Sequence, residues 1–212
     1  GNWIQIRMNP EDLGEILDFL KPLVNRSRFS AVAMYSISPS SINCVSEFIS
    51  DCSVFEVTFY DDVRTPYKSW LDLVGKVNPG RVDFYRLGSE REAEEFLFPL
   101  ADLVEIIDIC DAATDPSVEL PRLPFSDMKQ ILSRKCSQLI VHNSTLSLEE
   151  AEHFVQFFHH LSKVCYLQMR PNEDEMDEFA VQVGEYEIKS ISTLHGYMII
   201  IGHQNKKIPY FT

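Results

Sequence analysis

Short runs of apolar, β-prone residues recur along this chain with a spacing that few folds can accommodate. The runs are FSAVAMY from Phe29, VFEVTFY from Val54, RVDFYRL from Arg81, LVEIIDI from Leu103, QLIVHN from Gln138 and KVCYLQM from Lys163. Successive starts therefore differ by 25, 27, 22, 35 and 25 residues. Self-similarity at such a period indicates stacked repeats, in which each unit buries its apolar face against its neighbours.

Amphipathic segments with helix-start signals lie between these runs. Pro10 precedes a segment whose apolar residues fall three and four positions apart, from Leu13 to Leu20. Ser147 is followed three residues later by Glu150, which is the spacing of a capping box. Strands that alternate with helices imply parallel pairing, because each return to the sheet needs a crossover. The sequence therefore predicts an α/β fold with a parallel sheet.

One unit carries a spacing typical of leucine-rich repeats, Leu-x-x-Leu-x-Leu-x-x-Asn/Cys. Cys136, Leu139 and Val141 occupy its apolar positions, with Asn143 one residue early. The same offsets occur in Cys52-x-x-Phe55-x-Val57-x-Phe59 and in Leu161-x-x-Val164-x-Tyr166. We therefore expect an irregular, leucine-rich-repeat-like stack, with strands inside the curve and helices outside. A doubly wound sheet is the alternative, but it would bury both faces of its strands in continuous apolar runs, and several strands here alternate.

Two segments interrupt the rhythm of the units. Residues 111–124, DAATDPSVELPRLP, are predicted to form a surface loop. After Pro171 the acidic stretch NEDEMDE leads into a β-prone tail with expected turns near Gly196 and Asn205. We expect residues 1–170 to form the strand–helix units and residues 171–212 to form an antiparallel β cap of the same domain, because the terminal unit of a stack needs shielding.

The strand patterns also predict a surface for a partner. We expect Leu139/Val141, Phe55/Val57, Val82/Phe84, Val104/Ile106 and Val164/Tyr166 to face the core. Alternation then sends their neighbours outward. The predicted partner-binding set is Tyr35, Glu56, Thr58, Tyr60, Asp83, Tyr85, Glu105, Ile107, Ile140, His142 and Leu167, with Ala33 and Cys165 beside it. Aromatic residues flanked by carboxylates favour protein recognition. A solvated or helix-covered strand face with no partner is the alternative.

The charge balance narrows the class of partner. The chain has 19 Lys and Arg against 32 Asp and Glu, a formal net charge of −13. Nucleic acids and anionic membranes both require a cationic surface, and the basic residues form no such cluster. We therefore expect a protein partner with a basic or apolar contact face. No apolar run approaches the ~18 residues of a membrane span and no signal peptide is recognised, which predicts a cytoplasmic or nuclear location.

No motif for chemistry is found. Five widely spaced cysteines include no Cys-x-x-Cys pair, and they are expected to be reduced and buried. His153 and His160 share a helix face but lie two turns apart, roughly 10 Å, too far for one metal ion. No Gly-x-Ser-x-Gly elbow and no glycine-rich phosphate loop occur. We expect no catalytic residue, metal or cofactor, so an enzyme is the least favoured of the function classes.

One region of the chain is similar to a known family. The segments LPFSDMKQILSRKCSQLIVHNSTLSLEEAEHFVQFF and LSKVCYLQMR resemble the C-terminal region of nematode F-box proteins, called the F-box-associated type 2 or FOG-2-homology domain. The likeness is best over residues 120–170 and looser elsewhere. The shared pattern is a Cys-Ser strand, an Asn-Ser turn, a helix that starts Leu-Ser-x-Glu-Glu, and another strand.

This resemblance implies a role in ubiquitin ligation. In such families an F-box docks on a Skp1-type adaptor, and the associated domain captures the substrate. No F-box sequence is present here, so the adaptor is an expected partner only if an F-box lies upstream. The resemblance thus predicts a substrate- or partner-recognition domain of an F-box-type ubiquitin ligase receptor. An oligomeric scaffold or adaptor with no link to a ligase is the alternative.

Overall fold

The computed structural model describes residues 13–24, 28–35, 38–60, 66–85, 93–110, 123–144, 148–161, 166–171, 180–193 and 196–203 of the chain. Along it, strands and helices alternate as the repeat predicts. The strands are β1 (Arg28–Tyr35), β2 (Ser53–Tyr60), β3 (Arg81–Tyr85), β4 (Ile106–Cys110), β5 (Gln138–Ser144), β6 (Tyr166–Pro171), β7 (Ala180–Val183), β8 (Tyr186–Thr193) and β9 (Gly196–His203). The helices are α1 (Leu13–Val24), α2 (Pro39–Ile49), α3 (Tyr67–Val77), the π-helical turn η1 (Ala93–Leu97), α4 (Phe98–Ala101), α5 (Phe125–Leu132) and α6 (Leu148–His160).

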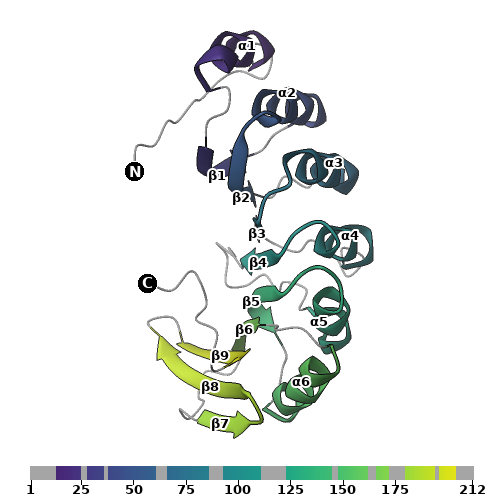
Figure 1. The fold of residues 1–212 in the computed structure, drawn as a ribbon, viewed down its shortest axis with the longest axis vertical. Coiled ribbons are helices and arrows are strands. Elements are labelled where there is room, and N and C mark those ends of the chain that lie inside the picture. The colour runs from purple at the N-terminus through teal and green to yellow at the C-terminus, as the bar shows by residue number, and fades with distance from the viewer. Residues whose placement is uncertain are drawn as a thin grey trace, which may run out of the picture.

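All nine described strands belong to one curved sheet. Their order is β1-β2-β3-β4-β5-β6-β9-β8-β7, and β1 to β6 pair in parallel. The helices line the convex side of the arc and the strands line the concave side (Figure 1). The predicted α/β stack of strand–helix units with a parallel sheet is confirmed.

The expected antiparallel C-terminal strands are also present. They continue the parallel sheet, because β9 pairs antiparallel with β6 and places Ile201 beside Leu167. The ring of Tyr186 on β8 packs against Phe158 of α6, with centroids 5.4 Å apart. Tyr186, Ile188 and Ile201 are buried in the same core as the repeats. The described strands of the cap thus shield the last helix, while the bounds 1–170 and 171–212 stay predictions.

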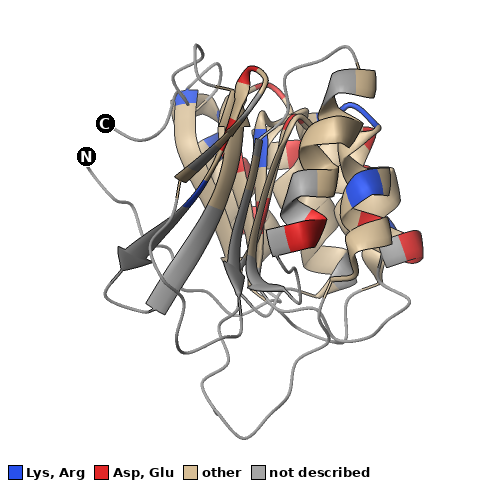
Figure 2. Ribbon diagram, turned by 90° about the horizontal axis from the view of Figure 1, so that it is seen from below, with Lys and Arg blue, Asp and Glu red and all other residues tan. Residues whose placement is uncertain are grey.

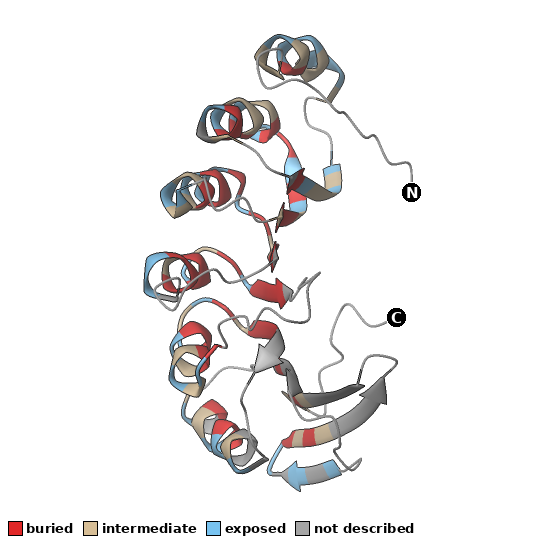
Figure 3. Ribbon diagram, turned by 180° about the vertical axis from the view of Figure 1, so that it is seen from behind, coloured by how far each residue is buried: buried red, intermediate tan, exposed pale blue. Residues whose placement is uncertain are grey.

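The strand register aligns the apolar residues of successive units in columns. One column runs Val32, Val57, Val82, Ile107, Leu139 and Leu167 across six parallel strands. A second runs Met34, Phe59, Phe84, Ile109 and Val141. From Val57 onward every member of the first column is fully buried. The buried parts of the helices turn toward the strands (Figure 3).

In each strand, one residue from each column forms a pair of core positions. A third apolar position lies three residues before the first member of that pair. The units are Val54-x-x-Val57-x-Phe59, Pro79-x-x-Val82-x-Phe84, Val104-x-x-Ile107-x-Ile109 and Cys136-x-x-Leu139-x-Val141. Burial of these residues confirms the core positions predicted for Cys136, Leu139 and Val141. In the predicted unit from Cys52, burial confirms Cys52, Val57 and Phe59, but the phase is wrong at Phe55, which is 37% exposed while Val54 enters the core. In the predicted unit from Leu161, Val164 and the side chain of Tyr166 lie outside the described part of the structure.

The same error of phase affects two predicted surface residues. Ile107 and Leu167 were assigned to the outward face, and that assignment is wrong, because both are fully buried in the core. Ile106, assigned to the core, instead pairs in register with Arg81 and Gln138, outside the core cluster. The physical reason is that two residues separate the first apolar position from the second, whereas only one would separate them in a strand of simple alternation.

Helices are held over the sheet by aromatic contacts and defined ends. Trp70 of α3 lies 4.2 Å from the ring centroid of Phe59 on β2, and Phe96 of η1 lies 4.9 Å from that of Phe84 on β3. Helix α3 ends at Asn78, which adopts φ 49° and donates its N–H to the carbonyl of Val74 at 2.8 Å. This left-handed cap turns the chain back into the next strand.

The corrected core positions predict that two substitutions close to the start of β4 differ in their effect on stability. Ile107→Ala should lower the free energy of unfolding by about 2–5 kcal/mol, because it leaves a cavity in the central column. Glu105→Ala removes an exposed side chain and should change stability by no more than about 0.5 kcal/mol. Urea denaturation of both variants measures the difference, and equal effects would contradict the assigned faces.

Candidate functional site

The concave face of the parallel sheet is the candidate site. All the described helices lie on the other side of the strands, as the view along the sheet shows (Figure 2). Side chains on the concave face therefore have no described helix packed over them. A face left open by the architecture is where a stack of this kind presents binding residues.

Three register columns cross this face. The first holds Ala31, Glu56, Arg81, Ile106 and Gln138, and the second holds Ala33, Thr58, Asp83, Asp108 and Ile140. At the strand ends a third column holds Tyr35, Tyr60, Tyr85 and Cys110 as neighbours. The face thus combines charged positions in its middle with three consecutive tyrosine positions along one edge.

Arg81 is the centre of a charged network on this face. Its Nε donates to Asp83 Oδ1 at 2.5 Å, and its Nη2 donates to Asp108 Oδ2 at 2.6 Å. Nη2 also reaches Asp83 Oδ2 at 3.4 Å, while Glu56 Oε2 lies 3.6 Å from Nε. Thr58 Oγ1 donates to Glu56 Oε1 at 3.4 Å. One guanidinium therefore holds three carboxylates that come from three adjacent strands.

The carboxylates of this network are largely buried, so their charges affect the pKa values of the groups around them. Asp83 is 8% exposed and Asp108 is 5% exposed. Burial, assisted by the charges of Asp108 and Glu56, outweighs the attraction of Arg81 and raises the pKa of Asp83 to about 6. Burial alone would lower the pKa of Arg81, but its hydrogen bond to Asp83 and the surrounding negative charge raise it, so the guanidinium stays protonated.

The structure separates the predicted site residues whose side chains it describes into three groups. Thr58, Asp83 and Ile140 lie on the concave face but are buried, whereas Glu56 and Tyr60 are partly accessible and Glu105 is exposed. Ile107 and Leu167 belong to the core. Tyr35, Tyr85 and His142 lie within described strands, but their side chains are outside the described part of the structure, as are Val164 and Cys165 altogether.

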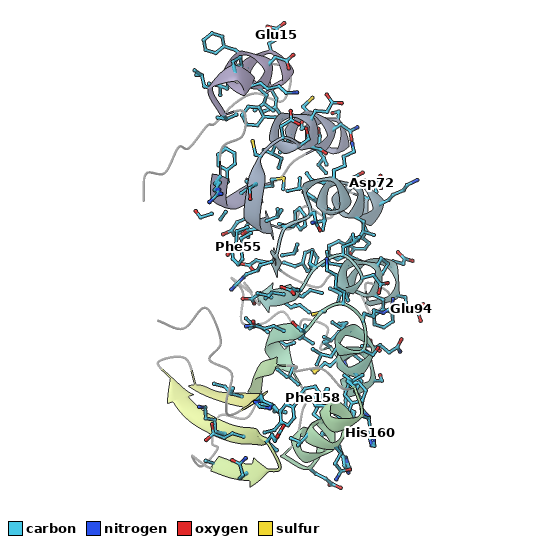
Figure 4. The ribbon with its side chains drawn as sticks, in the orientation of Figure 1. Glu15, Phe55, Asp72, Glu94, Phe158 and His160 are labelled. Carbon is cyan, nitrogen blue, oxygen red and sulfur yellow. The ribbon has the colours of Figure 1, made fainter. Side chains whose placement is uncertain are left out.

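The accessible part of the face lies over β1 and β2, at the N-terminal end of the stack. Ser30 and Ala33 are exposed there, beside the partly exposed Glu56 and Tyr60. Phe55 is also exposed and lies on the opposite side of the strands from Asp72 of α3 (Figure 4). An exposed aromatic ring beside a carboxylate is a suitable contact surface for a protein partner.

Sequence reasoning missed Arg81 and Asp108, although a signal was available. The unit spacing of 25 residues places Arg81 beside Glu56 and Ile106, so that Asp108, two residues beyond Ile106, falls beside Asp83. Because opposite charges at neighbouring register positions attract, this pairing could have been read from aligned units.

Gln138 also lies on this face, one strand beyond the network. It is 6% exposed, and its amide Nε2 has no hydrogen-bond partner among the described residues. Ile106 and Ile140, its neighbours in the sheet, are buried as well. Among the described side chains of this face, the accessible ones therefore lie on β1–β3, and the partner-binding set contracts toward those strands.

Among the described residues no group of three or more His, Cys, Asp or Glu side chains is placed to hold a metal ion. Within the same residues no helix has the length and apolar character needed to cross a membrane.

Comparison with known proteins yields no match to a family model, to a curated protein or to a solved structure. The resemblance to F-box-associated domains therefore stays a prediction from sequence.

The buried network predicts that replacing Arg81 lowers the free energy of unfolding more than replacing the exposed Arg134 does. Arg81→Met should lower the free energy of unfolding by about 3–5 kcal/mol, because three carboxylates lose their counter-ion in a buried setting. Arg134→Met breaks an exposed pair with Asp102, 2.5 Å apart, and should cost at most about 1 kcal/mol. Chemical denaturation at pH 7 measures both losses of stability. Equal losses would show that the buried carboxylates do not depend on the charge of Arg81.

The raised pKa of Asp83 predicts a specific pH dependence. Since the folded state holds this proton more tightly than the unfolded chain, the stabilising contribution is complete below the ordinary value of 3.8 and is lost as pH rises through about 6. The loss should be on the order of 1–3 kcal/mol. Asp83→Asn should lack it. Asp72→Asn makes the same change of charge at an exposed position of α3 and provides the reference. Parallel stability curves between pH 4 and 6.5 for these two variants would contradict the assignment.

Proposed function

We propose that this chain is a protein-recognition domain that binds a polypeptide on the concave face of its sheet. The observation that supports the proposal most is the arrangement of helices on one side only, which leaves six parallel strands without a described helix on the other. The accessible residues Phe55, Glu56 and Tyr60 all belong to β2, and Glu56 and Tyr60 stand in register columns of that face.

The chemistry of this surface favours a partner with basic and apolar residues. Glu56 and Glu105 are accessible carboxylates, and the chain as a whole carries a net charge of −13. The only described cation of the face near them, Arg81, is already held by Asp83 and Asp108. A lysine or arginine of the partner would therefore meet a negative potential, and an apolar partner residue could pack on Phe55.

We further propose that the recognition role belongs to an F-box-type ubiquitin ligase receptor. Support for the ligase link comes from the resemblance in residues 120–170 alone. On this proposal the concave face captures the substrate, and a Skp1-type adaptor binds an F-box upstream of Gly1. The concave face can bind a polypeptide whether or not the chain belongs to a ligase receptor. The recognition proposal and the ligase proposal can therefore be refuted separately.

An oligomeric scaffold is the second candidate function. It is favoured by one observation, the exposure of Phe19 and Leu23 on α1 at the end of the stack. A molecular mass that rises with concentration in light scattering would support it. A constant monomer mass would remove it.

The recognition proposal predicts that concave-face substitutions reduce binding selectively. A peptide ligand would be selected from a displayed random library against the intact chain and measured by titration calorimetry. Glu56→Gln and Tyr60→Ala should each weaken binding about tenfold, which corresponds to ~1.4 kcal/mol. The convex-face variants Asp72→Asn and Glu94→Gln, which project from the helices (Figure 4), should bind as the wild type does.

The outcome that contradicts the proposal is a selected ligand whose affinity depends on Asp72 or Glu94 and not on Glu56 or Tyr60. Affinity should also fall as salt rises, because accessible charge pairs are screened. A salt-independent affinity would exclude the basic partner while leaving an apolar one.

The ligase link makes its own prediction. The full reading frame should encode a helical F-box before Gly1, and its product should co-purify with a Skp1-type adaptor. A full product with no such segment and no adaptor binding would refute the ligase link and leave the recognition role to its own test.

A further inference from the structure

Arg81 lies between carboxylates that differ in their access to solvent. Its Nε and Nη2 contact Asp83 and Asp108, at 2.5 Å and 2.6 Å, and both aspartates are buried. Glu56, whose Oε2 lies 3.6 Å from the same Nε, is partly exposed on β2. Glu56 is therefore the carboxylate of the network that a partner can reach most readily.

The Nε of Arg81 is the atom for which Asp83 and Glu56 compete. An arginine Nε carries a single hydrogen. In the structure this hydrogen is donated to Asp83 Oδ1, and the 3.6 Å to Glu56 Oε2 is too long for a hydrogen bond from the same nitrogen. The other oxygen of Glu56, Oε1, accepts from Thr58 Oγ1. Because ionised carboxylates are stronger acceptors than neutral carboxyl groups, the charges of Asp83 and Glu56 decide which of them receives the Nε hydrogen.

Asp83 is the member of this pair whose charge changes near neutral pH. Among the described residues, the charged groups that face it are Arg81 on its own strand, Glu56 of β2 and Asp108 of β4. Burial, which is the largest influence, raises the pKa of Asp83 to about 6, with help from Asp108 and Glu56 and against the opposing effect of Arg81. Once protonated, Asp83 competes less well for the Nε hydrogen, and Glu56 Oε2 is the nearest other described carboxylate oxygen to that atom.

We propose that protonation of Asp83 regulates partner binding on the concave face, because it transfers the Nε hydrogen bond of Arg81 from Asp83 to Glu56. This inference rests on the proposed function, in which Glu56 meets a basic residue of the partner. With Asp83 ionised, the aspartates hold Arg81, and Glu56 is accessible to that residue. With Asp83 neutral, Arg81 pairs with Glu56 and the attraction for a basic partner falls. Loss of the proton from Asp83 and binding are therefore linked, so that affinity rises with pH.

NMR of the ligand-free wild-type chain tests the transfer itself. The carboxyl carbons of Asp83 and Glu56 and the Nε–H of Arg81 are followed between pH 7.5 and pH 5. The Arg81 resonance should shift together with the titration of Asp83, and Glu56→Gln should alter its position at the low-pH end more than at the high-pH end. An Nε–H that does not respond to the titration of Asp83 would overturn the proposal. A Glu56→Gln effect of equal size at both ends would also overturn it.

Titration calorimetry with a basic peptide tests the consequence for binding. The probe is a peptide selected against the intact chain, blocked at both ends, whose only ionisable residues are lysine and arginine. Its affinity for the wild type should be weaker by about threefold or more at pH 5.5 than at pH 7.5. Asp83→Asn should bind more weakly than the wild type at pH 7.5 and lose most of this pH dependence. Asp72→Asn, on the convex side, should keep the pH dependence of the wild type.

The variants separate Asp83 from other titrating groups. Histidine side chains generally change charge in the same pH range, and Asp83→Asn retains all six of them. A peptide that requires Glu56 but weakens equally with pH in the wild type and in Asp83→Asn would overturn this inference and leave the proposed function standing. A chain against which no Glu56-dependent peptide can be selected would refute the proposed function, and this inference with it.

Discussion

The column of buried side chains formed by Val57, Val82, Ile107, Leu139 and Leu167 is the interaction on which the rest of the fold depends. Each member contributes apolar area on both sides, so no unit can bury its own face alone. Because the column lies between the sheet and a single row of helices, the curvature of the stack follows from it: helices are wider than strands and must lie on the outside. The aromatic contacts of Trp70 and Phe96 attach that outer row to the strands.

The packing of the described helices on one side of the sheet also determines the character of the opposite face. Positions between the apolar ones point away from the helices, and there the protein places charges that compensate one another. Arg81 joins Glu56, Asp83 and Asp108 from three strands, so the network reinforces the same register that the apolar columns set. A buried network of this kind contributes little net stability but penalises misaligned strands strongly, because a misaligned unit would leave a charge unpaired. We therefore attribute to it a role in register, next to the acidic and aromatic surface proposed for a partner.

The sequence was sufficient to predict the repeat, the α/β class, the parallel sheet and the antiparallel C-terminal strands, because these follow from local spacing of apolar residues. It was insufficient for the phase of several strands. Ile106 and Ile107 are adjacent and chemically identical, and only the step from Val104 decides which one faces the core. The Arg81–Asp108 pair joins residues 27 positions apart and becomes visible only when units are aligned at their true interval. Burial of Thr58 and Ile140 on the concave face could not be predicted either, because it depends on tertiary packing rather than on alternation.

The central claim is that a polypeptide binds where the helices are absent. Amide chemical-shift mapping of the isotope-labelled chain, titrated with a basic peptide selected for binding, tests it most directly. The account predicts shifts confined to β1, β2 and β3, with the largest near Phe55, Glu56 and Tyr60. Shifts confined to α2, α3 and α5 on the convex side would contradict it.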